Sequence, residues 1–418
     1  MSSLRFAFVT TFYPPHNFGG DGIAVQRLAR ALARRGHRVT VIYDADAYDL
    51  LAPAAAPPAE PEPEGVEVVA LRSRLGGLSP ILTHQLGRPI VHRRRLAELL
   101  DRGDFDVVNF HNISLVGGPG ILSCGGSALK VYLAHEHWLV CPTHVLWRDD
   151  REPCPGKRCF RCTLRHRRPP QLYRYTGLLE RRLHEVDVFV ALSEFSRAKH
   201  EEFGFPRPME VLPAFLPELP EDTMVEGGAP PHPRPYLLFA GRLERLKGLD
   251  DVLPAFADPQ SPIDLLVAGD GRHGPTLRSL AGAGERVRFL GQLTGMELAR
   301  YYRHALAVLS PSLGFETFGL TLIEAFRQGT PVLARRGGPA VEILSQAGAG
   351  FLFDTPPELV AAAERLLTEE GLRDRLAAAA RAAFSERWSE AAVLPRYLDL
   401  IDRTAERKGV VLGRGSDA

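Results

Sequence analysis

The chain has 418 residues, of which 45% are hydrophobic and 24% charged, with 51 Lys and Arg against 50 Asp and Glu. This length predicts two or three domains. The composition is ordinary for a globular protein, which excludes collagen, a disordered acidic tail, a disulfide-dense mini-protein and a strongly basic nucleic-acid binder. No apolar run approaches the roughly 18 residues that span a bilayer, and the first residues lack the cleavage site of a secretory signal, so we expect a cytoplasmic protein.

Short apolar runs alternate with longer amphipathic segments in the first half of the chain. The clearest helix is predicted at Gly22–Arg35, where apolar residues recur at helical spacing and Gly36 ends the pattern. The strands predicted here are Leu4–Thr11, Arg38–Tyr43, Val66–Leu71, Asp106–Phe110, Lys130–Ala134, Val186–Leu192 and Met209–Pro213. Such alternation predicts a parallel sheet with helices on both faces, and we assign residues 1–213 to a first domain.

A proline-rich segment at residues 214–235 interrupts the alternation and is predicted to link two domains. A second domain follows over residues 236–386, and a last helical stretch occupies residues 387–407. Its predicted strands are Tyr236–Ala240, Ile263–Ala268, Val287–Leu290, Ala305–Leu309, Pro331–Ala334 and Gly350–Phe353. The predicted fold class is therefore α/β, with two doubly wound, Rossmann-like domains facing across a cleft. Ligands of such sheets bind at the carboxyl ends of the strands.

The most informative motif follows the fourth predicted strand of the second domain. A glycine-containing loop there leads into a helix, and seven residues separate Glu316 in the loop from Glu324 in the helix. Free backbone N–H groups at the helix start would form an anion site, at Phe318, Gly319 and Leu320. Acids beside an anion site are suited to accept hydrogen bonds from sugar or ribose hydroxyl groups. The alternative is a helix start whose acids complement the helix dipole.

Two cations follow the first strand of the second domain. Gly241 allows the chain to turn, and Arg242 and Lys247 would lie at the carboxyl edge of the sheet. Such cations could neutralise a leaving diphosphate without a metal. Lys247 is the only Lys between residues 200 and 407 of an Arg-dominated chain, which favours a specific role for it. The alternative is a solvated basic turn.

Two first-domain segments add weaker candidates. Gly19 and Gly20, between the first strand and the first helix, would allow a ligand to approach the backbone closely. His135, at the end of a predicted buried strand, would face the cleft, and His111 at the end of the preceding strand is a similar but weaker candidate. A hydrogen-bonded structural histidine is the alternative for both.

Four of the five cysteines cluster directly after the His135 strand. The spacing of Cys141, Cys154, Cys159 and Cys162 is C-x12-C-x4-C-x2-C. This spacing predicts a structural zinc site in an insertion at about 138–170, and free thiols or disulfides are the alternatives. No open ligand position is indicated, so we expect no catalytic metal.

Residues 157–182 contain nine Lys or Arg and one acid. They could contact an acidic acceptor or the inner face of a membrane, or they could form a solvated basic face.

Asp44-Ala45-Asp46 matches the Asp-x-Asp of metal-dependent sugar transferases, but we expect it in a surface loop. Gly269–Gly274 matches G-x-G-x-x-G, but no βαβ unit with a ribose-binding acid follows, so we do not assign it to a dinucleotide.

Together these motifs resemble the large retaining glycosyltransferase family 4, which has the two-domain GT-B fold. The resemblance spans residues 8–345. Its strongest part is the Glu-x7-Glu block with Phe-Gly and Gly-Thr-Pro. The other matching pieces are the Gly-Gly loop, Arg35-Gly-His-x-Val39, Gly241–Gly248, Ala268–Gly271, Phe289–Gly291 and Gly337-Gly338 before Glu342.

The resemblance implies a role for each matching residue. Arg242, Lys247 and the backbone of 318–320 would bind the donor diphosphate, and Glu324 would bind the ribose. Glu316 would bind the transferred sugar. Further donor contacts are implied for Gly19, Gly20, Gly271 and Leu290.

His135 matches the first-domain histidine of the family, near the sugar and the acceptor. The family's usual His-Asp is His-Glu here, which puts the role of Glu136 in doubt. The family's last helix crosses back to the first domain, which would account for the stretch after Trp388.

The resemblance therefore implies a retaining hexosyltransferase that moves a sugar from a nucleotide-diphospho-sugar to a hydroxyl group of an acceptor. The expected donor is a UDP-sugar, and the acceptor would be a saccharide, a lipid or another molecule with a hydroxyl group. The family's usual proposal is front-face departure with no metal and no carboxylate nucleophile. One alternative is a sugar-nucleotide epimerase on the same fold. Another is a zinc-knuckle RNA-binding protein that uses residues 157–182, whereas the main prediction involves no nucleic acid.

Overall fold

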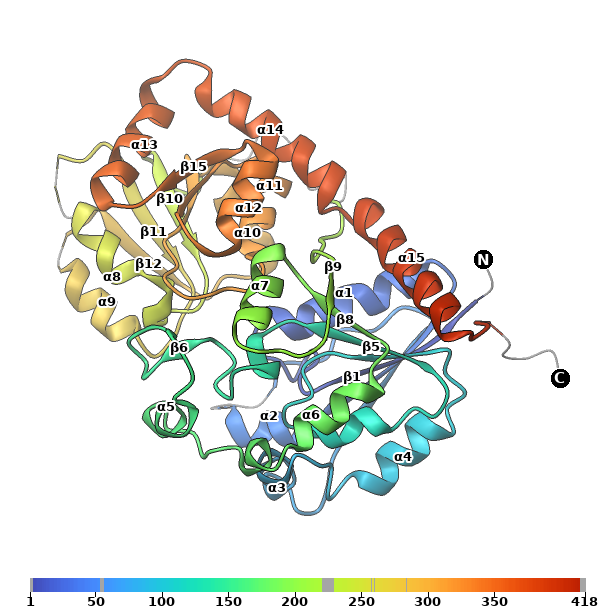
Figure 1. Ribbon diagram of the computed structural model, residues 1–418. Helices are drawn as coiled ribbons and strands as arrows, with labels where there is room; N and C mark the ends of the chain where they lie inside the picture. Colours follow the sequence, from blue (N-terminus) through green and yellow to red (C-terminus); the bar gives the residue numbers. More distant parts are fainter. Residues whose placement is uncertain are drawn as a thin grey trace.

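The computed structural model describes residues 3–52, 56–219, 229–256, 258, 260–282 and 284–413. These residues form two large parallel sheets, each covered by helices (Figure 1), and one antiparallel two-stranded ribbon. The predicted fold class is confirmed. No helix within these ranges combines the length and the apolar character needed to cross a bilayer.

The first sheet has the strand order β3-β2-β1-β4-β5-β8-β9, and all of its pairs are parallel. Its strands are β1 (Arg5–Thr10), β2 (Arg38–Asp44), β3 (Val66–Leu71), β4 (Val107–Phe110), β5 (Leu129–Ala134), β8 (Val188–Ala191) and β9 (Met209–Val211). The central strands β1, β4, β5 and β8 are buried along nearly their whole length. Burial on both faces explains why these strands are continuous apolar runs in the sequence.

Helices cover both faces of the first sheet. They are α1 (Gly20–Arg34), α2 (Ala45–Leu51), α3 (Leu78–Leu86), α4 (Arg93–Asp101), α6 (Leu178–Arg182) and α7 (Glu194–Glu202). Four 3-10 turns accompany them: η1 (Gly118–Ser123), η2 (His137–Leu139), η3 (Leu172–Tyr175) and η4 (Leu183–Glu185). The insertion after β5 holds the ribbon β6 (Trp147–Arg148) and β7 (Glu152–Pro153) and the short helix α5 (Cys159–Arg165).

The second sheet has the order β12-β11-β10-β13-β14-β15 and is also parallel. Its strands are β10 (Tyr236–Ala240), β11 (Asp264–Ala268), β12 (Val287–Gly291), β13 (Ala307–Ser310), β14 (Val332–Arg335) and β15 (Gly350–Phe353). Its helical elements are η6 (Arg245–Lys247), α8 (Leu249–Val252), η7 (Leu253–Phe256), α9 (Gly274–Ala281), α10 (Gly295–His304), α11 (Leu320–Arg327), α12 (Gly338–Ala347), α13 (Pro356–Thr368) and α14 (Leu372–Arg387).

The last helix, α15 (Glu390–Lys408), leaves the second sheet and packs on the first, as Figure 1 shows. Its Tyr397 lies in the same apolar core as α1, and the Tyr397 hydroxyl accepts a hydrogen bond from Asn109 Nδ2 of β4 at 3.1 Å. At its end, Lys408 Nζ donates to Asp187 Oδ2 at 2.8 Å. The helix therefore ties the end of the chain to the first domain.

Two residues of the predicted linker are anchored to folded parts of the chain. Leu216 forms a parallel bridge with Ser389, and His232 Nε2 lies 2.7 Å from the buried Asp264 Oδ2. Residues 220–228 lie outside the described residues. The described parts of the segment are therefore held in place at Leu216 and His232.

Candidate active site

The carboxyl edges of the two sheets meet at a seam between the domains. Thr317, in the loop between β13 and α11, makes two hydrogen bonds across this seam. Its Oγ1 donates to the backbone oxygen of His135 at 2.7 Å, and its own backbone oxygen accepts from Ser193 Oγ at 2.7 Å. His135 follows β5 and Ser193 follows β8, so the loop that precedes α11 is held between the domains.

The start of α11 lies at this seam against the N-terminal glycine loop. Gly319 caps the helix with φ +103°, in the left-handed region that favours glycine. A Cβ on Gly20 would lie only 2.9 Å from Leu320 Cδ1, so the two domains approach closely at this point. The first N–H groups of a helix have no partner within the helix, so this start is a geometrically suitable anion site. The Phe318 side chain is buried in the second-domain core, which leaves its backbone to contribute.

Lys247 and Glu316 form an ion pair beside this helix start. Lys247 Nζ lies 2.9 Å from Glu316 Oε1. Burial would raise the pKa of Glu316, but Lys247, with smaller contributions from Ser312 and Arg242, holds that pKa below its ordinary value. Glu316 is therefore a carboxylate at neutral pH, and the structure brings together two residues that the sequence placed in separate motifs.

Arg242 lies at the exposed rim of the same edge. Its side chain is 60% exposed and pairs with Glu244 at 3.2 Å. Its charge still lowers the pKa of Glu316, so it contributes to the electrostatic field of the site. An exposed arginine held by one weak surface pair is free to turn toward an incoming anion.

Glu324 has a partner from each domain. Its Oε2 accepts a hydrogen bond from the Tyr302 hydroxyl at 3.1 Å, and its Oε1 lies 3.9 Å from Arg27 Nη2 of α1. Arg27 and Tyr302 were not predicted as site residues. Both lie in helices without a distinctive local motif, and their partner is remote in sequence, so no local signal could have identified them.

His135 is paired with His111 rather than isolated. His135 Nε2 lies 2.8 Å from His111 Nδ1, so one ring donates a hydrogen bond and the other accepts it. Burial lowers the pKa of both histidines, although Asp21 and Glu136 oppose this effect at His135. Both rings are therefore neutral at pH 7, and the weaker of the two sequence candidates proves to be the partner of the stronger.

Glu136, at the family's Asp position, turns toward the insertion. Its Oε1 lies 2.7 Å from His144 Nδ1. Glu136 thus orders the start of the insertion.

Gly271 and Leu290, for which donor contacts were implied, both pack against other residues of the second domain. A Cβ on Gly271 would lie 2.4 Å from the Leu243 backbone oxygen, and Leu290 packs against the second-domain core.

The four clustered cysteines are free thiols that do not gather tightly. Each of three sulfurs has a local partner: Cys141 contacts Thr143 Oγ1, Cys154 donates to the Gly156 oxygen, and Cys162 accepts from Asp149 N. No three cysteine sulfurs within the described ranges lie within 4.8 Å of one another. A tetrahedral zinc with Zn–S bonds of about 2.3 Å requires closer sulfurs. Zinc at these cysteines stays a prediction that requires the side chains to move.

The Asp44–Asp46 segment corrects one expectation. It does not form a surface loop: Asp44 ends β2, both carboxylates are buried, and Asp44 Oδ1 accepts a hydrogen bond from Ala47 N to cap α2. A residue at the end of an inner strand of the sheet is covered by the segments that follow it, and the acidic tripeptide alone does not indicate this burial.

The chain matches known glycosyltransferase families and individual glycosyltransferases. Residues 18–216 match the model of Glycosyltransferase Family 4, and residues 221–383 match that of Glycosyl transferases group 1. D-inositol 3-phosphate glycosyltransferase of Xylanimonas cellulosilytica is 30% identical, with 93% of each chain covered. Phosphatidyl-myo-inositol mannosyltransferase of Mycobacterium tuberculosis H37Rv is 28% identical over 88% of this chain and 90% of its own.

Solved structures share the fold at lower identity. Sucrose-phosphate synthase of Thermosynechococcus elongatus has a TM-score of 0.68 at 18% identity, covering 97% of this chain and all of its own. Anabaena HepE in complex with UDP and glucose has a TM-score of 0.63 at 19% identity, covering 96% of this chain and all of its own. With both sheets, the seam and two matched family models, the chain belongs to glycosyltransferase family 4 and is a glycosyltransferase of the GT-B fold.

Proposed function

We propose that this glycosyltransferase transfers a hexose from a UDP-sugar to an acceptor hydroxyl with retention of configuration. The observation that carries the proposal is the Lys247–Glu316 pair, 2.9 Å apart, beside the start of α11 at the seam. A cation and free backbone N–H groups suit a diphosphate, and an ionised carboxylate next to them suits sugar hydroxyl groups. The UDP and glucose in the structure of HepE support a donor of this class.

The donor would bind across the seam with its diphosphate on the second domain. Lys247, Arg242 and the first N–H groups of α11 would neutralise its charge, which grows on the leaving diphosphate as the glycosidic bond breaks. Glu324 would accept hydrogen bonds from the ribose, and Glu316 from the hexose. Gly20 leaves room for this approach because it carries no side chain toward Leu320.

Retention would follow from attack on the same face of the sugar from which the diphosphate leaves. The acceptor oxygen then bonds to the anomeric carbon, the bond to the diphosphate oxygen breaks, and a diphosphate oxygen takes the acceptor proton. The neutral His135 ring lies on the first-domain side of the seam, where it would form a hydrogen bond with the sugar or the acceptor. No step needs an enzymic carboxylate nucleophile.

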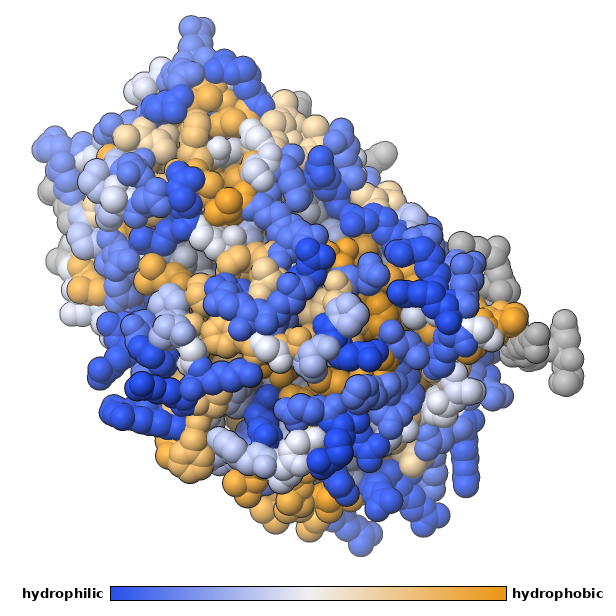
Figure 2. All heavy atoms as spheres, in the orientation of Figure 1, coloured by the Kyte–Doolittle hydropathy of each residue, from blue (hydrophilic) through white to orange (hydrophobic). Residues whose placement is uncertain are grey.

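We also propose that the first domain contacts an anionic membrane. Exposed apolar side chains adjoin there on α3, α5 and η3, and orange atoms lie along this lower edge in Figure 2. They are Leu78, Ile81, Leu86, Phe160, Leu164, Leu172 and Tyr175. Apolar side chains bordered by arginines suit the interface of an anionic bilayer.

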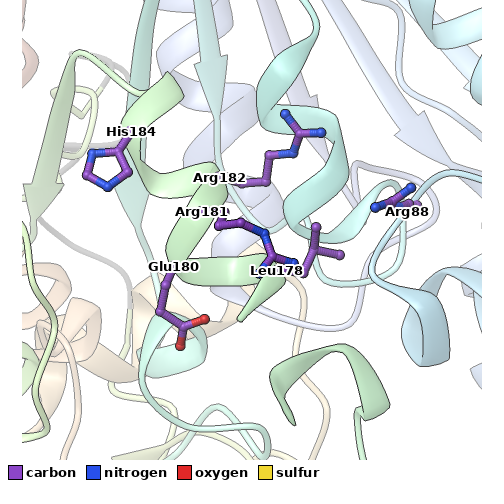
Figure 3. A pocket seen from close by; sticks show the side chains of 6 residues that line it. All are labelled: Arg88, Leu178, Glu180, Arg181, Arg182 and His184. Carbon is purple, nitrogen blue, oxygen red and sulfur yellow. The ribbon is translucent and has the colours of Figure 1, made fainter. Parts of the chain in front are cut away.

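A basic cavity borders this apolar surface. It has a volume of about 530 Å³ and is lined by Arg88, Leu178, Glu180, Arg181, Arg182 and His184 (Figure 3). Arg88 lies two residues after the exposed Leu86 at the end of α3, so the cavity adjoins the apolar surface. A phosphate-bearing headgroup fits its charge. The name of the mycobacterial relative, phosphatidyl-myo-inositol mannosyltransferase, supports an acceptor of this kind.

The experiment that tests the transferase proposal is donor screening followed by product analysis. Thermal-shift screening against UDP-, GDP- and ADP-sugars should give its largest stabilisation with a UDP-sugar. Proton NMR of a product made from an α-linked donor should show the α-anomer. A β-linked product, or conversion of the donor to an epimer with no acceptor, would contradict the proposal.

A further inference from the structure

Three buried side chains with metal-ligating atoms gather outside the donor site. Asp44, Asp46 and His92 each offer one ligand atom, and these atoms all lie within 4.8 Å of one another. The described residues contain no other such group of three or more His, Cys, Asp or Glu. All three residues are less than one-tenth exposed.

Two segments far apart in the sequence supply these residues, the junction of β2 with α2 and the residue before α4. Asp44 ends β2, Asp46 lies in the first turn of α2, and His92 is the residue before α4. Asp46 also reaches the segment after β3, because its Oδ2 accepts hydrogen bonds from Ser73 N at 2.9 Å and Ser73 Oγ at 2.7 Å. The cluster is therefore built by the fold rather than by one loop.

The two carboxylates lack a compensating cation from the protein. Within the described residues, neither Asp44 nor Asp46 has a Lys or Arg at ion-pair distance, and the only such partner is the imidazole of His92. Burial raises the pKa of Asp44 to about 7, and the nearby Asp46 adds to this effect. Two buried carboxylates are costly unless a proton or a cation balances their charge.

The cluster also contains unpartnered ligand atoms. His92 Nε2 lies 3.5 Å from Asp46 Oδ2, yet it has no hydrogen-bond partner, and its side chain is 8% exposed. Asp44 Oδ2 is likewise buried without a partner, whereas its Oδ1 is held by Ala47 N. Outer hydrogen bonds thus orient the two carboxylates while other ligand atoms stay free, an arrangement typical of metal sites.

We propose that Asp44, Asp46 and His92 bind one divalent transition-metal cation, of the Zn²⁺ or Mn²⁺ class. Carboxylate oxygens alone would suit Mg²⁺ or Ca²⁺, and the imidazole nitrogen shifts the preference toward transition metals. Water or backbone oxygens would complete the coordination. The site is separate from the four clustered cysteines and from the Lys247–Glu316 pair.

The cation would hold the acceptor side of the seam together. It would join the end of β2 to the start of α4 and, through Ser73, to the segment after β3. Tyr48 of α2 stacks on Phe18 with ring centroids 4.7 Å apart, and Phe18 directly precedes the glycine loop. A cation that holds α2 in place therefore also holds Phe18 beside Gly19 and Gly20. The role of the cation is structural, and the cation takes no part in the transfer reaction.

The test measures binding of Co²⁺ and Zn²⁺ to the full chain after removal of metal with a chelator. We expect a cation to bind at Asp44, Asp46 and His92 with a rise in the melting temperature, and Co²⁺ at this site to give visible d–d bands. A thiolate charge-transfer band would arise only from Co²⁺ at the cysteines. Asp44→Asn should weaken this binding at least tenfold, although asparagine still caps α2. His92→Gln should do the same through a different ligand, which guards against a folding defect in one variant.

A cysteine variant separates the two metal predictions. The double change Cys159→Ser and Cys162→Ser should remove any thiolate charge-transfer band and leave the cation at Asp44, Asp46 and His92 in place. The proposal is overturned if this double variant binds no Co²⁺ or Zn²⁺. It is equally overturned if Asp44→Asn and His92→Gln bind the metal with the affinity and the melting-temperature rise of the wild type.

Discussion

At the scale of single residues, the site depends on charges that are paired before any ligand arrives. Lys247 holds Glu316 ionised in a half-buried position, and Tyr302 with Arg27 holds Glu324. A paired carboxylate and ammonium are already oriented, so less conformational freedom is lost when a sugar nucleotide binds.

Replacing Lys247 by Ala tests this arrangement. The variant should slow transfer about 100-fold, because one cation that stabilises the leaving diphosphate is lost. The melting temperature should fall much less than the activity, since Glu316 remains partly exposed to water. Steady-state kinetics and thermal unfolding measure the two effects.

Arg245→Ala is the matched control for Lys247→Ala. Arg245 lies on the same 3-10 turn, η6, but is exposed to solvent. Its loss should leave transfer nearly unchanged. Equal losses of activity in the two variants would mean that the turn needs only positive charge and that Lys247 has no specific role.

Residue types and short motifs predicted individual candidates but not their pairing. The Glu-x7-Glu block and Gly-Arg-Leu predicted Glu316, Glu324 and Arg242 because backbone and charge requirements leave local patterns. The ion pair of Glu324 with Arg27 and the hydrogen bond between His135 and His111 join residues far apart in sequence. Such contacts depend on how helices and strands pack, which a single sequence does not encode locally.

At the scale of elements, the start of α11 is the part that links fold to chemistry. Gly319 adopts a left-handed conformation at the N-terminal cap of α11, and the next residue, Leu320, lies against Gly20 at the seam. The position of the start of α11 therefore depends on glycine at residue 319.

Gly319→Ala should destabilise the protein by roughly 1–2 kcal/mol, because an L residue is strained at this φ. It should also weaken UDP binding at least tenfold, because the helix start would shift to relieve the strain. Chemical unfolding and calorimetric titration with UDP measure these outcomes.

Gly348→Ala provides the comparison for Gly319→Ala. Gly348 also has a positive φ, +59°, at the end of α12, where a Cβ would meet no atom within 4 Å, and it takes no part in the seam. The substitution should lower stability without changing UDP affinity. If both alanine variants bind UDP equally well, the start of α11 is not the diphosphate site.

The strands were predictable because burial on both faces leaves continuous apolar runs. All strands predicted for the two sheets are present, with ends that differ by no more than two residues. The ribbon of β6 and β7 and the buried Asp44 were not predictable. Two-residue strands have no periodicity, and the burial of an acid at a strand end depends on segments that fold over it later in the chain.

At the scale of the whole molecule, buried histidines make the domain seam sensitive to acid. His137 Nε2 lies 3.0 Å from the Phe315 oxygen of the other domain. Burial, with the nearby His200, lowers the pKa of His137 to about 3 from 6.5. Between these pH values the unfolded chain binds a proton that the folded chain does not, so the free energy of unfolding falls as the pH falls.

This difference in pKa predicts that the free energy of unfolding falls by about 2 kcal/mol between pH 7.5 and pH 5 because of His137 alone. His137→Gln should therefore lose less stability than the wild type between pH 7.5 and pH 5, as measured by urea unfolding. The exposed His184→Gln should behave like the wild type. An unchanged pH dependence in His137→Gln would show that His137 does not stay neutral in the fold.

The apolar surface of the first domain predicts membrane binding. Vesicles that contain anionic lipid should sediment the protein, and neutral phosphatidylcholine vesicles should do so weakly. Phe160→Ser and Arg181→Glu should each reduce this binding several-fold. Met296→Ser, on a more exposed apolar side chain of the second domain, should have no effect, and a similar loss in all three variants would contradict the proposed surface.

The most direct test of the account is a crystal structure with a UDP-sugar bound. We predict the diphosphate against Lys247, Arg242 and the first N–H groups of α11, with Glu316 facing the hexose and Glu324 the ribose. A donor bound elsewhere, or a diphosphate that touches neither cation nor the helix start, would contradict the account.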